Sequence, residues 1–106
     1  LLYQMIHKLI SNAFKYANPH SKVLLSFNLV EGRMVIQVQD EGPGIAIVEQ
    51  EKIFERFYRT SSARGLPGTG LGLSIVKQLA KKFGGTISLK SELGGSSVFT
   101  LSLPLA

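Results

Sequence analysis

The sequence predicts an α+β fold in which helices pack on one face of a largely antiparallel sheet. Three observations support this prediction. Two long segments carry hydrophobic residues at helical spacing, four shorter segments read as strands, and the strands come in pairs joined by short turns. Strands joined by a short turn run antiparallel, and the helical segments precede and separate the two pairs.

Two amphipathic helices are expected, at residues 1–17 and 71–83, with a shorter helical stretch at 48–57. Asn18-Pro19 ends the first helix, because the residue before a proline is pushed out of helical geometry. Gly84-Gly85 ends the last helix. The apolar face of the first helix consists of Leu2, Met5, Ile6, Leu9, Ala13 and Ala17.

The strands are expected as two hairpins. Residues 23–30 and 34–40 flank the turn Glu31-Gly32, and residues 86–90 and 97–103 flank a turn at 92–95. In the second hairpin apolar and polar residues alternate, which places the apolar side chains on one face. These inward residues are Ile87, Leu89, Phe99, Leu101 and Leu103.

The composition limits the class of protein. The chain has 106 residues, enough for one domain, and 44% are hydrophobic, as in a globular protein. It has no Cys, which excludes disulfides, zinc fingers, iron–sulfur clusters and thiol catalysis, and its two His lie in no metal-ligand spacing. No apolar run approaches the roughly 20 residues of a membrane span. The chain begins inside a helix without a Met or a cap, so we expect residues 1–106 to be one N-terminally truncated domain of a larger protein.

The net charge of +5 is spread along the chain, and no nucleic-acid-binding motif accompanies it. A smaller polyanion such as a nucleoside triphosphate needs only a few of these cations. Alternatively, most of them belong to solvated faces, an interpretation favoured for Lys77, Lys81 and Lys82 on the outer face of the last helix.

One stripe of the first helix combines two cations, an amide and an aromatic ring. Lys8, Asn12, Lys15 and Tyr16 fall within about 100° of one another at the border of the apolar face. An amide oxygen can bind Mg²⁺, Lys15 could reach phosphates, and Tyr16 could cover a base. The alternative is an exposed Asn among lysines that extend along the surface.

Asp40 has the same strand parity as Met34, Ile36 and Val38, so it should face the core with them. A buried carboxylate needs hydrogen-bond donors. Its own loop amides could supply them in an Asx-turn, or a ligand could, such as the exocyclic amine of adenine. Gly42 and Gly44 in the following loop would permit close approach of a ligand.

Glycines also cluster where the last helix begins, in Gly68-Thr69-Gly70-Leu71-Gly72. Backbone amides at a helix N-terminus can bind an anion. The segment is neither a P-loop, because Leu71 follows Gly70 where a Lys is required, nor a dinucleotide-binding fingerprint, because Leu73 stands where a Gly is required.

The order and spacing of these elements resemble the catalytic ATP-binding domain of bacterial sensor histidine kinases, in the GHKL superfamily with the Bergerat fold. The likeness covers essentially the whole chain. Leu9-Ile-Ser-Asn12-Ala-Phe-Lys15-Tyr16 resembles the N box, Asp40-Glu-Gly42-Pro-Gly44-Ile45 the G1 box, Ile53-Phe54-Glu-Arg-Phe57-Tyr58-Arg59 the F box, and Gly68-Thr-Gly70-Leu-Gly72-Leu73 the G2 box.

The resemblance implies a two-layer α/β sandwich with a mixed, largely antiparallel sheet and ATP held between the helices and a lid. It implies that Asn12 binds Mg²⁺, that Asp40 accepts from adenine, and that Lys15 and Arg64 stabilise the transferred phosphate. The whole implied nucleotide site consists of Asn12, Lys15, Tyr16, Asp40, Gly42, Gly44, Ile45, Tyr58, Arg59, Gly68, Thr69, Gly70, Leu71, Gly72, Leu73 and Ser97, with Arg64 from the lid.

The same resemblance implies phosphoryl transfer from ATP to a histidine on a separate dimerisation domain of the same protein, with a response regulator downstream. The domain would be cytoplasmic, in a membrane-anchored sensor, and would itself contact neither nucleic acid nor membrane. Phe54 and Phe57 could grip the partner helices or anchor the lid, although core packing is favoured for Phe54.

Two positions depart from the family pattern. Lys8 replaces an Asn that is common in the kinases, and Ser96 replaces a Gly of the last box. A lysine cannot act as the carboxylate base of an autonomous ATPase. Two alternatives to the kinase therefore remain: a nucleotide-binding regulatory module without catalysis, and the ATPase domain of a DNA-handling protein.

Overall fold

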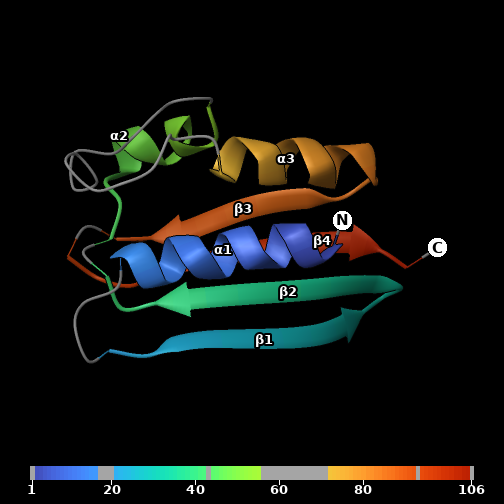
Figure 1. Cartoon of the computed structure of the whole chain (residues 1–106), viewed down its shortest axis with the longest axis horizontal. Coiled ribbons are helices and arrows are strands. Elements are labelled where there is room, and N and C mark those ends of the chain that lie inside the picture. The colour runs from blue at the N-terminus through green and yellow to red at the C-terminus, as the bar shows by residue number, and fades with distance from the viewer. Residues whose placement is uncertain (1, 17–20, 43, 56–71, 93, 106) are drawn as a thin grey trace.

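The computed structural model describes residues 2–16, 21–42, 44–55, 72–92 and 94–105 and shows two layers, a sheet and a layer of helices on one of its faces (Figure 1). The elements follow in the order α1 (Leu2–Tyr16), β1 (Val23–Val30), β2 (Arg33–Asp40), α2 (Ile47–Gln50), the 3-10 helix η1 (Lys52–Phe54), α3 (Gly72–Lys82), β3 (Thr86–Ser91) and β4 (Ser97–Pro104). The predicted two-layer arrangement is confirmed. None of the described helices is long and apolar enough to cross a membrane.

The four described strands form one sheet in the order β1-β2-β4-β3, and every neighbouring pair is antiparallel. Both predicted hairpins are present, with the first turn at Glu31 and Gly32 and the second closed by a hydrogen bond from the Gly95 amide to the Glu92 carbonyl. The predicted strand limits are correct to within one residue. The predicted largely antiparallel sheet is therefore confirmed.

The region expected as one helix at 48–57 is broken. It forms α2, which ends at Gln50, and then the tighter η1, after which Glu55 is extended; residues 56 and 57 lie outside the described part. The break allows two different contacts. Gln50 directs its amide to a neighbouring loop, while Ile53 is buried and Phe54 packs edge-on against Phe99 with ring centroids 6.3 Å apart.

The core lies between the helices and the central strands. Because strand side chains alternate, every second residue of β2 and β4 faces α1 and α3. Burial of this apolar area is the main stabilising contribution to folding. The buried residues are Met5, Leu9, Ala13, Ile36, Val38, Ile53, Val76, Ala80, Phe99, Leu101 and Leu103.

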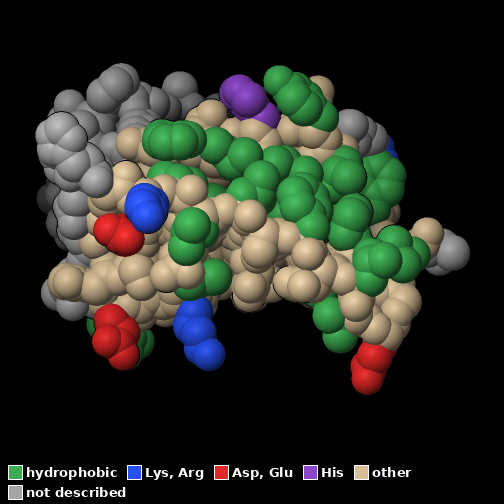
Figure 2. All heavy atoms as spheres, turned by 90° about the horizontal axis from the view of Figure 1, so that it is seen from below, with side chains coloured by type: hydrophobic (Ala, Val, Ile, Leu, Met, Phe, Trp, Pro, Cys, Tyr) green, Lys and Arg blue, Asp and Glu red, His purple; other side chains and the backbone are tan. Residues whose placement is uncertain are grey.

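The helix layer leaves strand β1 uncovered. Leu25, Phe27 and Leu29 pair with core-facing residues of β2 and so belong to the helix-facing side, yet Phe27 is 54% and Leu29 73% exposed. Figure 2 shows hydrophobic side chains gathered over this side of the molecule. From α1, Tyr3 and Phe14 add two further exposed rings. We call this set of residues the β1 face.

Candidate functional site

A row of polar side chains crosses the sheet at one end of its otherwise apolar inner face. Asp40 of β2 pairs with Ser97 of β4, and Ser97 pairs with Ser91 of β3. The same parity two residues away gives the core residues Val38 and Phe99, so the row faces the helix layer. Asp40 and Ser97 are each only 3% exposed. The predicted inward orientation of Asp40 is confirmed.

The Asp40 carboxylate is held by its own loop. Its Oδ1 accepts a hydrogen bond of 2.9 Å from the Gly42 backbone N–H. This is the Asx-turn that the sequence allowed as an alternative to ligand binding. Within the described part of the chain, however, Oδ2 receives no hydrogen bond. A turn and a ligand can therefore share this carboxylate, one on each oxygen.

Burial raises the pKa of the Asp40 carboxyl above its usual value, because the charged form loses its hydration. The hydrogen bond from Gly42 acts in the opposite direction and lowers this pKa, but the effect of burial is larger. For this carboxyl the loss of hydration thus outweighs the one hydrogen bond that Gly42 donates. A ligand that donated to Oδ2 would relieve part of this cost.

The loop that follows Asp40 is attached to the C-terminal end of β3. Ser91 Oγ accepts a 2.9 Å hydrogen bond from the Ile45 N–H, and Gln50 Nε2 donates at 2.8 Å to the Ile45 carbonyl. Gln50 Nε2 also donates at 2.8 Å to the Ser91 carbonyl. The hydroxyl groups of Ser91 and Ser97 are 2.8 Å apart. This loop and the polar row therefore form one hydrogen-bonded unit.

Gly44 is required where the loop meets the β3–β4 turn. Its φ is +75°, and a Cβ at this position would overlap the Glu92 carbonyl oxygen and reach 3.0 Å from the Gly95 carbonyl oxygen. Only glycine combines this backbone conformation with so close an approach at little cost. The sequence predicted that Gly44 would allow close approach, and the observed neighbour is the chain's own turn.

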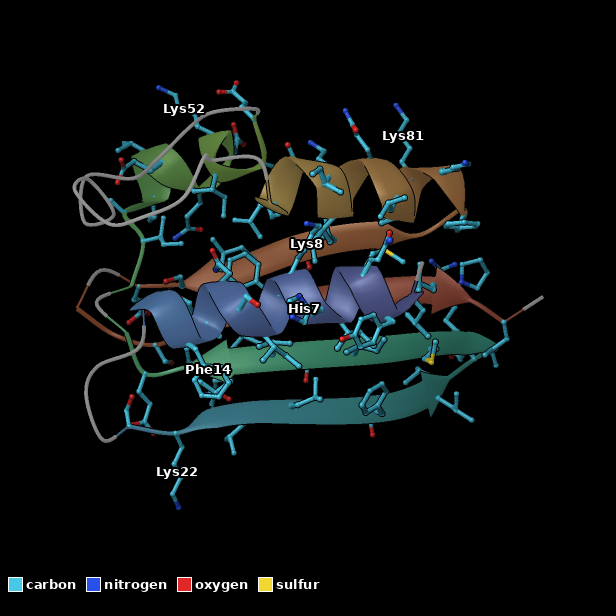
Figure 3. All side chains as sticks on the ribbon, viewed as in Figure 1. His7, Lys8, Phe14, Lys22, Lys52 and Lys81 are labelled. Carbon is cyan, nitrogen blue, oxygen red and sulfur yellow. The ribbon has the colours of Figure 1, made fainter. Side chains whose placement is uncertain are left out.

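Helix α1 brings the predicted Mg²⁺ ligand to the same end of the molecule. α1 packs on β2, and in Figure 1 its C-terminal half lies at the end of the sheet where β2 stops. Asn12 and Lys8 are half-buried. Figure 3 shows Lys8 on the side of α1 toward α3, Phe14 on the side toward β1, and Lys22, Lys52 and Lys81 at the periphery. Lys15 and Tyr16 belong to the last turn of α1, and their side chains lie outside the described part.

The predicted lid also lies outside the described residues. This applies to Tyr58, Arg59, Arg64, Gly68, Thr69, Gly70 and Leu71. Gly72 opens α3, as the predicted glycine-rich helix start requires, and Leu73 packs against the core. The structure thus brings Asp40, Gly42, Gly44, Ile45 and Ser97 together, with Asn12 on the helix that packs over β2.

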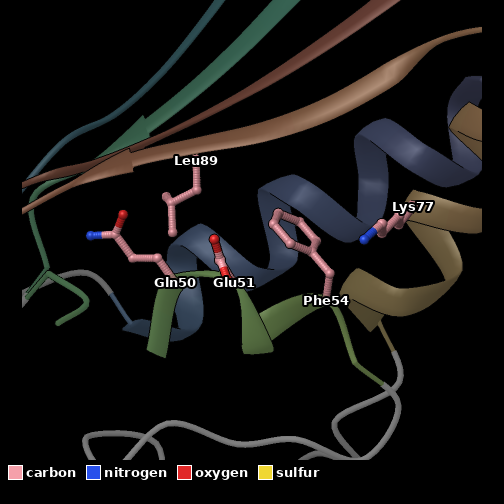
Figure 4. A pocket seen from close by; sticks show the side chains of 5 residues that line it. All are labelled: Gln50, Glu51, Phe54, Lys77 and Leu89. Atoms are coloured by element: carbon pink, nitrogen blue, oxygen red, sulfur yellow. The ribbon is translucent and has the colours of Figure 1, made fainter. Parts of the chain in front are cut away.

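An open hollow of about 470 Å³ lies between α2, η1, α3 and β3 (Figure 4). Its wall consists of Gln50, Glu51, Phe54, Lys77 and Leu89. Lys77 Nζ lies 5.8 Å from the centre of the Phe54 ring, within cation–π range. The prediction that Phe54 packs on the core is confirmed. Among the described residues of the predicted nucleotide site, none lines this hollow.

The sequence interpretation missed two residues of the loop attachment, Gln50 and Ser91. Ser91 was detectable, because it follows the inward Ile87 and Leu89 with the same parity and extends the row of Asp40 and Ser97. Gln50 carried no such signal, since its contacts cross from a short helix to a loop and a strand end.

The described residues contain no group of three or more His, Cys, Asp or Glu side chains that could hold a metal ion. A site in which one amide oxygen binds Mg²⁺ needs no such group, because Mg²⁺ takes its other ligands from phosphates and water. The half-buried Asn12 on α1 fits that donor set.

The sequence of the whole chain resembles those of known proteins. The whole chain, residues 1–106, matches the family described as histidine kinase-, DNA gyrase B-, and HSP90-like ATPase. It is 42% identical over 106 residues to the sensor histidine kinase RppB of Synechocystis, covering 98% of this chain and 23% of RppB. The chain therefore spans about a quarter of the length of this curated relative.

Solved structures of histidine kinases also resemble this chain in fold. The mycobacterial sensor histidine kinase MprB superposes with a TM-score of 0.87 and 32% identity, over 95% of this chain and 70% of that one. ShkA, solved at full length in complex with AMPPNP, has a TM-score of 0.84 and 34% identity, over 97% of this chain and 21% of that one. The fold is thus the Bergerat fold of histidine kinase ATPase domains, and this chain belongs to the histidine kinase-, DNA gyrase B- and HSP90-like ATPase family.

Proposed function

We propose that residues 1–106 form the catalytic ATP-binding domain of a sensor histidine kinase. The domain binds Mg-ATP and presents its γ-phosphate to a histidine on a separate dimerisation domain of the same protein. The observation that carries the proposal is the buried Asp40, one oxygen of which is held by Gly42 while the other is left for a donor. The exocyclic amine of adenine is such a donor. The AMPPNP complex of the related ShkA supports the choice of nucleotide.

Different residues of this chain bind the base, the metal and the phosphates. Asp40 accepts a hydrogen bond from the base, while Gly44 and Ile45 line the base at the edge of the sheet. Ser97, beside Asp40 in the polar row, adds a hydroxyl at the base. From α1, Asn12 holds the metal, Lys15 meets the phosphates and Tyr16 lies near the base.

The residues of the predicted lid, together with the start of α3, would bind the phosphate end. Gly68, Gly70, Leu71 and Gly72 supply backbone amides at a helix N-terminus, with Thr69 and Leu73 in the same motif. Tyr58, Arg59 and Arg64 approach the ribose and phosphates. Bound Mg²⁺ supplies charge neutralisation at the phosphates.

The transfer needs no nucleophile from this chain. A nitrogen of the acceptor imidazole forms a bond to the γ-phosphorus as the bond to the β-phosphate's bridging oxygen breaks, leaving ADP and phosphohistidine. Lys15 and Arg64 stabilise the charge of the transferred group, and binding holds it in line. His7, which is exposed and whose ring centroid lies 5.8 Å from that of Tyr3, is given no role in the transfer.

The partners follow from this chemistry. The acceptor domain lies elsewhere in the same protein, and a response regulator takes the phosphoryl group from it. The sensor histidine kinase RppB and the sensor protein SrrB of Staphylococcus aureus, the latter 38% identical over 103 residues, support this place in a two-component system. We place the domain on the cytoplasmic side of a membrane-anchored sensor.

Two measurements test the proposal. Calorimetry with ATP should show binding that weakens when EDTA removes Mg²⁺. Incubation with γ-labelled ATP and the acceptor domain should then give label that is stable to alkali and labile to acid, as expected for phosphohistidine. Absence of ATP binding, or steady release of phosphate by the isolated chain without an acceptor, would contradict it.

One observation favours a second candidate, a nucleotide-binding regulatory module without catalysis. Lys8 is half-buried on α1, one helical turn before Asn12, where many kinases carry an Asn. Lys8→Asn separates the two functions. If the chain binds ATP but transfers phosphate only after this substitution, the regulatory module is correct; transfer by the unaltered chain supports the kinase.

A further inference from the structure

Outside the predicted nucleotide contacts, the side chain of Gln50 holds two separate segments of backbone. Its Nε2 donates to two carbonyl oxygens, that of Ile45 and that of Ser91, each at 2.8 Å. An amide nitrogen has two hydrogens and can satisfy both acceptors at once. The opposite amide orientation would place the Gln50 oxygen against two carbonyl oxygens, so the orientation is set by the surroundings. Gln50 thereby ties the loop after β2 to the end of β3.

Ser91 supplies a second link to the same residue. Its Oγ accepts the Ile45 N–H at 2.9 Å, so both backbone polar groups of Ile45 are held by side chains. The hydroxyl also lies 2.8 Å from Ser97 Oγ and 3.3 Å from the Ser96 carbonyl oxygen. Because Ser91 has one hydrogen and two lone pairs, these contacts use all of its bonding capacity. Ser91 therefore also orients the hydroxyl of Ser97.

Two other described positions of the loop are held as well. The Gly42 N–H is bound to Asp40 Oδ1, and Gly44 is pressed against the carbonyl groups of the β3–β4 turn. Gly42, Gly44 and Ile45 are thus attached, in that order, to the polar row, to the turn and to α2. Residues held in this way have few alternative conformations to lose when a ligand binds beside them.

We propose that Gln50 and Ser91 are positioning residues for the nucleotide base, acting through Ile45 and Ser97; this inference rests on the proposed function. Neither residue touches the nucleotide. They hold the loop backbone and the Ser97 hydroxyl in the arrangement in which these groups meet the base next to Asp40. Loss of either residue should therefore affect recognition of the base and leave the metal and phosphate end unchanged.

The test uses two variants and two matched controls. Gln50→Leu and Ser91→Ala remove the links to Ile45. Gln37→Leu and Ser102→Ala remove comparable hydrogen bonds on the opposite face of the sheet, from Gln37 Nε2 to Thr100 Oγ1 at 3.2 Å and from Arg33 Nε to Ser102 Oγ at 2.7 Å. Ser91→Thr, which keeps the hydroxyl, serves as the rescue.

Two quantities are measured. Amide hydrogen exchange at Ile45 in the nucleotide-free chain reports the attachment itself. Dissociation constants for ATP and GTP, each with Mg²⁺ and with EDTA, report base recognition and metal dependence separately. We expect faster exchange at Ile45 in both variants and ATP binding weakened about 5- to 20-fold, as for the loss of one or two hydrogen bonds.

The preference for ATP over GTP should fall with the ATP affinity, while the ratio of affinities with and without Mg²⁺ stays constant. The two controls should stay within about twofold of the unaltered chain, and Ser91→Thr should recover most of the loss. Faster exchange with unchanged ATP and GTP affinities would show a purely structural role and overturn the proposal. Unchanged amide exchange at Ile45, or an equal loss of ATP affinity in the two controls, would also overturn the proposal.

The same measurements distinguish a failure of the positioning role from a failure of the proposed function. If the unaltered chain binds no ATP, the proposed function fails, and the positioning role fails with it. If the unaltered chain binds ATP and prefers it to GTP, and Gln50→Leu and Ser91→Ala keep the same ATP affinity and the same preference, the positioning role alone is wrong.

Discussion

Replacing Asp40 by Asn should weaken ATP binding and stabilise the empty domain at the same time. The substitution keeps the size of the side chain and an oxygen that can accept from the Gly42 N–H. It removes the buried charge and replaces Oδ2 with an NH₂ group. A donor on the ligand then meets a donor on the protein, whereas the carboxylate would have accepted it.

The magnitude for binding follows from the kind of hydrogen bond lost. A hydrogen bond to a charged group contributes about 1.5–3 kcal/mol, so ATP should bind about 10- to 150-fold more weakly to Asp40→Asn. GTP presents a carbonyl oxygen where ATP presents an amine, and its binding should weaken less or improve. Competition between the two nucleotides in calorimetry measures this ratio directly.

The effect on stability depends on pH with a definite sign. Burial raises the pKa of Asp40 in the folded chain above its usual 3.8, so the folded state holds the proton more tightly than the unfolded state. The stability contributed by the protonated carboxyl is complete below pH 3.8 and is lost as pH rises through the folded pKa. Above the folded pKa the unaltered chain therefore carries the cost of the buried charge.

Asp40→Asn should raise the melting temperature of the nucleotide-free chain at pH 7.5 and lose this advantage near pH 4. A gain of about 1 kcal/mol would correspond to a rise of about 4 °C in a chain of this size. Thermal unfolding followed by circular dichroism at both pH values is sufficient. A variant that is less stable at pH 7.5, or that keeps its full preference for ATP over GTP, would show that the carboxylate is not an under-supplied acceptor in the base site.

Three further variants, one of them a double substitution, test other parts of the molecule. Asn12→Ala should abolish the difference between ATP affinities measured with Mg²⁺ and with EDTA, leaving the EDTA value unchanged; a preserved difference would assign the metal elsewhere. Gly44→Ala should destabilise the fold by about 2–4 kcal/mol in chemical denaturation, because a Cβ overlaps the Glu92 carbonyl at a positive φ. Phe27→Thr combined with Leu29→Thr should reduce concentration-dependent light scattering of the isolated chain, since the β1 face joins exposed apolar side chains to an edge strand.

Strand parity carried most of what could be predicted about the site. It placed Asp40 on the inner face from the alternation of Ile36 and Val38, and the structure confirms this. Helical spacing likewise located α1 and α3 to within about one residue. These predictions succeed because a single element determines them. The roles assigned to Asn12 and to the lid residues remain predictions.

Features that depend on packing between elements were not predictable. The break between α2 and η1 accompanies the contacts of Gln50 with a loop and of Phe54 with Phe99, which local propensity does not encode. The exposure of β1 is a similar case. Its apolar residues are typical of a buried strand, but whether a helix covers them depends on where α1 packs, which is over β2.

The proposed role of Asp40 in binding the base would link the stability of this domain to its ligand. Continuing the apolar inner face through Asp40 and Ser97 would have extended the core by one more pair of buried side chains, with no charge to desolvate. The chain instead keeps a carboxylate there whose ionised form lowers the stability of the empty state. A ligand that donates a hydrogen bond to Asp40 offsets this cost, and it can do so only in the folded state. Part of the free energy of binding therefore comes from removing the destabilisation of the empty domain. Saturating ATP should therefore raise the melting temperature of the unaltered chain by more than that of Asp40→Asn. An equal rise in both would mean that the carboxylate takes no part in binding.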